Sequence, residues 1–145
     1  MLVVEHDLRR IRRENLRVLV AEFGAVWAAA EDQATTAAEA GVTDWFAGGV
    51  TRTCRWLAGA TYESRGQRRL PVAPITGRTS SAIEELIEAE YIAAVILAED
   101  TTSPLVRGRP GYVEAVVAAL GWAWRHNGPA PRLDRSNASS HRDQV

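Results

Sequence analysis

The chain has 145 residues, of which 46% are hydrophobic and 24% charged, and its formal net charge is −1. This length is enough for one compact core, and the balance is typical of a single globular domain. The one cysteine excludes an intramolecular disulfide and cysteine-rich zinc sites. All 17 basic residues are arginine, which excludes a Walker A loop, a pyridoxal-phosphate Schiff base and other lysine chemistry.

The start of the chain turns charged at Glu5, so no apolar core of a secretion signal is expected there. No apolar run approaches the roughly 20 residues that a membrane-spanning helix needs. Together with the single cysteine, these features favour a cytoplasmic protein without a membrane partner.

Apolar spacing predicts an all-α fold, a small bundle of four main helices. Residues 5 to 40 contain no proline, and apolar side chains from Leu8 to Ala30 recur along one stripe. This pattern predicts a single long helix that Gly41 ends.

The second helix is predicted from Thr43, as the N-cap, to a stop near Gly59. It contains Gly48 and Gly49, which together cost about 2 kcal/mol of helix propensity relative to alanine. Either a neighbouring backbone approaches these glycines closely, or the helix breaks there.

Residues 61 to 80 show neither helical periodicity nor strict alternation, and they contain two prolines. Leu70, Val72 and Ile75 alternate around these prolines. The pattern favours a long extended connection pressed against the bundle.

Ser81 and Glu84 have the spacing of a capping box, which predicts a third helix that ends near Asp100. Pro110 suits a first helical turn and predicts a fourth helix, which ends at Asn127. The single domain is therefore expected over residues 1–128. Residues 129–145 have little to bury and are expected to be a disordered tail.

Charge is unevenly distributed along the chain. Residues 42–80 hold six arginines and two acids, whereas residues 81–106 hold six acids and no arginine. Opposite charges favour the two segments as neighbours, within one fold or across a dimer. A solvated acidic helix face would also account for the glutamates.

The five tryptophans are many for this length. Trp122 and Trp124 are 200° apart on a helix, so one of them is predicted to lie at a surface, an interface or a pocket. Protein interfaces are enriched in aromatic residues and arginine, although large rings also fill cores. The predicted interface residues are the anchors Trp45, Phe46, Trp56, Trp122 and Trp124, with Arg52 and Arg55 at the rim.

Nucleic-acid binding is the alternative, because arginines cluster in residues 9–17 and in the extended connection. Its predicted contacts are Arg65, Arg68, Arg69 and Arg78. The second helix is poorly equipped to read bases, since aromatic and glycine residues occupy its start.

The sequence gives little support for an enzyme. Its three histidines are far apart, and Cys54 lies on the apolar stripe of the second helix, where a buried and inert thiol is expected. An enzyme with a histidine and glutamate site remains a disfavoured alternative, and no metal or cofactor is expected. The predicted function is a non-enzymatic protein–protein interaction module (an adaptor, accessory or inhibitor subunit), with a homodimer as one form.

Overall fold

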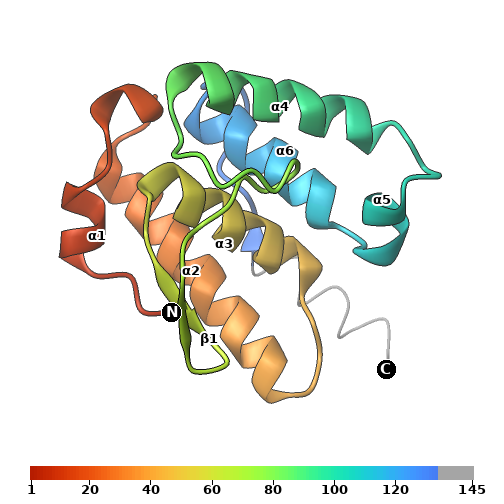
Figure 1. Cartoon of the computed structure of the whole chain (residues 1–145), viewed down its shortest axis with the longest axis horizontal. Helices are drawn as coiled ribbons and strands as arrows, with labels where there is room; N and C mark the ends of the chain where they lie inside the picture. Colours follow the sequence, from red (N-terminus) through yellow and green to blue (C-terminus); the bar gives the residue numbers. More distant parts are fainter. Residues whose placement is uncertain (134–145) are drawn as a thin grey trace.

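The computed structural model describes residues 1–133, and these are mostly helical (Figure 1). The predicted all-α bundle of four main helices is confirmed. The long helices are α2 (Val20–Glu39), α3 (Trp45–Ala58), α4 (Glu84–Ala98) and α6 (Tyr112–Ala123). The short elements are α1 (Glu5–Arg9), the 3-10 turn η1 (Arg13–Asn15), α5 (Pro104–Gly108), β1 (Tyr62–Ser64) and β2 (Gln67–Arg69).

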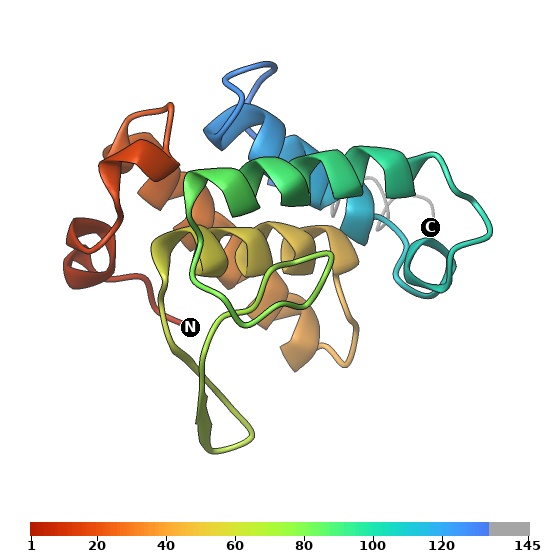
Figure 2. The same ribbon diagram turned by 45° about the horizontal axis from the view of Figure 1, so that its top comes forward.

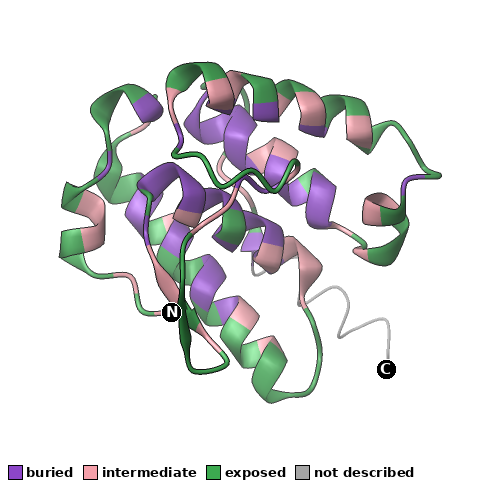
Figure 3. Cartoon of the chain, viewed as in Figure 1, coloured by how far each residue is buried: buried purple, intermediate pink, exposed green. Residues whose placement is uncertain are grey.

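The four long helices are not arranged in chain order. α3 packs between α2 and α6, and α4 packs against α6 (Figures 1 and 2). The buried residues are concentrated on α3 and α6, as Figure 3 shows. Because α4 is at the edge of this arrangement, a large part of its surface has no helix against it.

The prediction of one helix over residues 5–40 is wrong, since the chain leaves the helical path between α1 and α2. In this break Asn15 is buried, and its side-chain amide donates a hydrogen bond to the carbonyl of Ala82 at 3.0 Å. The backbone N–H of Arg17 donates to the carbonyl of Ala123 at 2.7 Å. These tertiary hydrogen bonds to the start of α4 and the end of α6 replace the helical ones that periodicity alone favours.

α3 begins one residue later than predicted. Asp44, not Thr43, is the N-cap, and its carboxylate accepts a hydrogen bond from the N–H of Ala47 at 3.0 Å. The helix ends as predicted at Gly59, which has the left-handed conformation of a C-terminal glycine (φ 63°).

The two glycines inside α3 have different surroundings. A Cβ at Gly49 would lie 2.6 Å from the carbonyl oxygen of Tyr112 and 2.7 Å from Cβ of Ala115, whereas a Cβ at Gly48 would meet nothing within 4 Å. The close approach of a neighbouring backbone, one of the two alternatives, is therefore confirmed at Gly49. It lets α3 and α6 pack together at short range.

The extended connection begins with a β-hairpin that the sequence pattern did not indicate. β1 and β2 pair antiparallel around Arg65 and Gly66, which both have positive φ (53° and 76°), as in a type I′ turn. Strands of three residues are too short to show alternation. The hairpin extends away from the helices (Figure 2).

Residues 70–83, here called the strap, follow the hairpin and cross the bundle. Ala73 and Pro74 are buried and Val72 and Ile75 half-buried, so this part is pressed against the helices as predicted. Leu70 is exposed and does not contribute to that packing.

Two helix starts differ from the prediction. The capping box at Ser81 does not form, because residues 82 and 83 are still extended; Ile83 is the N-cap of α4. Pro110 lies before α6, whose N-cap is Gly111 (φ 90°). The proline that does occupy a first turn is Pro104, in the short helix α5.

The packed part of the chain continues beyond the predicted domain boundary at 128. Leu133 is buried, and residues 127–132 lie along α6. The rest of the predicted tail, 134–145, lies outside the described residues.

Candidate functional site

The two tryptophans of α6 are both buried within the single chain. Trp122 is 7% exposed and Trp124 is 8% exposed. Of the three locations predicted for one of them, a surface, an interface or a pocket, the surface is therefore wrong. Trp122 stacks on Phe23 of α2, with ring centroids 6.4 Å apart. Trp124 donates its indole N–H to the carboxylate of Glu88 on α4 at 2.8 Å. Both rings are buried because α6 is covered by neighbours on more than one side.

Two more of the predicted interface residues have partners inside the chain. Trp56 is buried and donates its indole N–H to the carbonyl of Ser80 in the strap at 3.0 Å. Arg55 binds the buried carboxylate of Glu31 through two hydrogen bonds, at 2.8 and 2.7 Å. Trp27 donates to the same carboxylate. These residues join α2, α3 and the strap.

The remaining predicted residues lie together near the first half of α3. Trp45 and Phe46 are half-buried, and Arg52 is exposed. The Arg52 guanidinium carbon lies 5.9 Å from the ring centroid of Tyr112.

Sequence reasoning missed two residues of this cluster, Arg109 and Tyr112. The guanidinium carbon of Arg109 lies 5.2 Å from the ring centroids of both Trp45 and Tyr112. The two rings meet edge to face with centroids 6.3 Å apart. No local pattern could have joined them, since about sixty positions of sequence separate the two segments.

The outward side of α4 is the most apolar exposed helix surface. Ile92, Val95 and Ile96 are 45%, 38% and 67% exposed, and their spacing places them side by side. Glu85 and Glu99 are exposed at the two ends of the same stripe, and Ala89 lies between. This surface, called the α4 face, consists of Glu85, Ala89, Ile92, Val95, Ile96 and Glu99.

The other acids of α4 are satisfied within the chain. Glu84 pairs with Arg17 at 3.4 Å, and Glu88 pairs with Arg125 at 2.8 Å. Within residues 1–133, Glu85 and Glu99 make no salt bridge. Within residues 1–133, no salt bridge joins the acids of α4 to the arginines of residues 42–80, although the two segments are neighbours.

The side chain of Glu90 binds backbone groups of the strap. This buried carboxylate accepts hydrogen bonds from the N–H groups of Ile75 and Thr76, at 2.5 and 2.8 Å, and from the Thr76 hydroxyl at 3.0 Å. The hydroxyl of Tyr112 donates to the carbonyl of Pro74 at 2.6 Å. The strap is thus held at its bend by α4 and α6.

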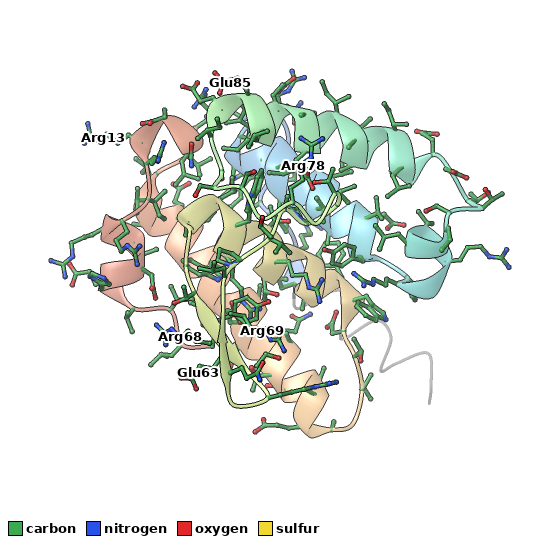
Figure 4. All side chains as sticks on the ribbon, in the orientation of Figure 1. Arg13, Glu63, Arg68, Arg69, Arg78 and Glu85 are labelled. Atoms are coloured by element: carbon green, nitrogen blue, oxygen red, sulfur yellow. The ribbon has the colours of Figure 1, made fainter. Side chains whose placement is uncertain are left out.

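The arginines of the nucleic-acid alternative occupy two places. Arg65, Arg68 and Arg69 are exposed on the hairpin, where Arg68 approaches Glu63 at 3.8 Å. Arg78 lies at the other end of the strap's bend, well separated from Arg68 and Arg69 in Figure 4. The four therefore do not form one cluster.

No known protein family matches the chain, and no curated protein or solved structure matches it significantly. Within residues 1–133, no helix is long and apolar enough to cross a membrane.

The described residues hold no cluster of metal-binding side chains, and their one cysteine is buried. Over residues 1–133, no three metal-binding side chains come together. Cys54 is buried as expected, and burial raises the pKa of its thiol, which suppresses the reactive thiolate. A cavity of 170 Å³ lies under the strap beside Trp56, Leu86 and Glu90, below the roughly 300–1,000 Å³ of typical ligand pockets. A larger hollow of 300 Å³, at the lower end of that range, lies between Phe46, Tyr91 and Pro129.

Proposed function

We propose that this protein is a protein–protein interaction module and that its binding surface is the α4 face. The exposure of Ile92, Val95 and Ile96 on one continuous stripe carries the proposal. Contiguous apolar side chains on a protein surface commonly mark an interaction site, whereas single ones need no explanation. Of the tryptophans named from the sequence, Trp56, Trp122 and Trp124 are buried in the core of the single chain.

The charges at the ends of the α4 face indicate the partner. Glu85 and Glu99 are 14 positions apart, which is about 21 Å along a helix. A second copy packed antiparallel would place Glu85 against Glu99 of its partner, and a parallel copy would align identical acids. Like charges in these positions are unfavourable. We therefore propose that the partner is a different protein. It presents an amphipathic helix with basic residues at both ends of an apolar stripe.

Two synthetic peptides of about 18 residues test this proposal, since that length spans the face. They share one apolar helical stripe and carry arginine at both ends or glutamate at both ends. Fluorescence anisotropy should show binding of the arginine peptide about tenfold tighter than that of the glutamate peptide. The double variant Glu85→Arg with Glu99→Arg should reverse this preference.

Ile96→Asp should weaken the arginine peptide about tenfold, because it places a charge in the centre of the apolar stripe. Val42→Asp is the matched control, since Val42 is exposed to a similar degree (59% against 67%) but lies outside α4. Equal affinity for both peptides, or equal loss in both variants, contradicts the proposal. A wild-type dimer in sedimentation that Ile96→Asp dissociates would show that the occupant is a second copy.

A further inference from the structure

The surface in front of α3 carries arginines that have no counter-charge within the described chain. Arg52 and Arg109 flank the ring of Tyr112, at 5.9 and 5.2 Å. Neither makes a salt bridge to any carboxylate of residues 1–133. The acid nearest to Arg52 in sequence, Asp44, accepts hydrogen bonds from Gln33 and the N–H of Ala47. The acid nearest to Arg109, Glu114, is exposed and makes no salt bridge within residues 1–133.

The basic surface continues from Arg52 to the hairpin. Arg52 and Tyr62 line the same small hollow of 60 Å³, together with Pro71 and Val72. Tyr62 is the first residue of β1 and is paired in register with Arg69. These contacts form a continuous path that runs from Arg109 over Tyr112 and Arg52 to Tyr62 and Arg69. We call the guanidinium groups of Arg109, Arg52 and Arg69 the arginine track.

Aromatic rings alternate with these arginines. Trp45 and Tyr62 are half-buried, so neither residue is enclosed by the core. Tyr62 is held in place by Arg55, whose guanidinium carbon lies 4.2 Å from its ring centroid, and Arg55 is itself fixed by buried Glu31. The track thus combines unpaired positive charge with rigidly held aromatic surface.

We infer that the arginine track binds the phosphodiester backbone of single-stranded nucleic acid, with Trp45 and Tyr62 available for base stacking. Single-strand binding proteins combine a positively charged path for phosphates with aromatic rings on which unpaired bases stack. An acidic peptide would use the arginines but would leave the aromatic rings without a role. This surface is separate from the α4 face. It also extends beyond the hairpin arginines predicted from the sequence, because it includes Arg52, Arg109 and Trp45.

The test measures binding of fluorescein-labelled 12-mers of thymidine and of uridine by anisotropy, at about 50 mM and about 200 mM salt. The wild-type protein should bind at the lower salt and lose affinity at the higher. A difference between the two oligonucleotides would report whether the 2′-hydroxyl contributes.

Arg52→Gln with Arg109→Gln removes two charges from the track, and Arg9→Gln with Arg10→Gln (the α1 variant) removes two exposed charges at the end of α1. The second pair belongs to the other arginine cluster that the sequence suggested for nucleic acid, so the comparison tells the two surfaces apart. The track variant should bind about tenfold more weakly and show a smaller salt dependence, while the α1 variant should stay within about twofold of wild type. Arg69→Gln, on the exposed hairpin, should weaken binding about threefold without involving the packing of Tyr112.

Three outcomes would overturn the inference. The first is no binding of either oligonucleotide at the lower salt. The second is an equal loss in the track and α1 variants, which would indicate unspecific attraction. The third is displacement of the oligonucleotide by an equal concentration of a glutamate 12-mer, which would assign the surface to acidic peptides.

Discussion

Glu90 shows how one buried charge can organise an otherwise irregular segment. Its carboxylate is 3% exposed and accepts three hydrogen bonds from Ile75 and Thr76. A buried carboxylate is tolerated when hydrogen bonds replace those of water. Sequence reasoning placed Glu90 in an acidic helix but could not give it this role, since its partners are backbone groups and carry no sequence signal.

Glu90→Ala should lower the free energy of unfolding by about 2 kcal/mol, because it leaves buried N–H groups of the strap unpaired. Urea denaturation measures the loss, and trypsin should cleave after Arg78 faster than in the wild type. Glu85→Ala removes an exposed carboxylate from the same helix and is the control. The proposed role fails if both variants unfold at the same urea concentration.

Among the elements, α3 was predicted well and the region before α2 was not. In α3 the apolar spacing, the polar residue at its start and Gly59 at its end all agree with one helix. Over residues 5–40 the periodicity also agreed with a helix, but hydrogen bonds from Asn15 and Arg17 to distant segments overrode it. Local pattern decides an element only where no tertiary contact competes for its backbone.

Gly49 and Gly48 give a matched test of the α3 and α6 contact. Gly49→Ala should destabilise the protein by about 1–3 kcal/mol, because its Cβ would overlap the backbone of Tyr112. Gly48→Ala meets open space and should stabilise it by about 0.5–1 kcal/mol through helix propensity. Thermal unfolding of the two variants measures the difference. Equal changes in both would mean that the helices are farther apart than described.

The molecule as a whole uses its aromatic residues as core. Four of its five tryptophans are buried, and only Trp45 is half-buried. Helical periodicity placed Trp122 and Trp124 on different sides of a helix, but their exposure depends on how many neighbours surround α6, which periodicity does not show. The number of tryptophans therefore did not point to the surface that we propose for binding, the α4 face, whose exposed apolar residues are aliphatic.

Stability should fall in alkaline solution. Burial raises the pKa of Cys54 above its ordinary 9.0 and that of Tyr112 above its ordinary 10.0. Both groups stay protonated in the folded state while the unfolded chain ionises, so their contribution is complete below about pH 9 and is lost as the pH rises. Urea unfolding between about pH 8 and about pH 10 should show this decline.

Cys54→Ala should reduce that decline, because it removes the group that ionises first in the unfolded chain. The two proteins are compared by the slope of their free energy of unfolding against pH. This slope does not contain the cost of the cavity that the variant creates, which is the same at every pH. A slope identical to wild type would contradict a contribution from Cys54. The absence of lysine helps the measurement, since few other groups titrate in this range.

The spatial order of the helices also affects how the chain folds during its synthesis. α4 precedes α6 in the sequence, yet α6 is the helix against which it packs. During synthesis from the N-terminus, α2 and α3 can associate early, whereas α4 leaves the ribosome with Ile87 and Ala94 uncovered. The native core closes only when α6 emerges and inserts between two helices that are already made.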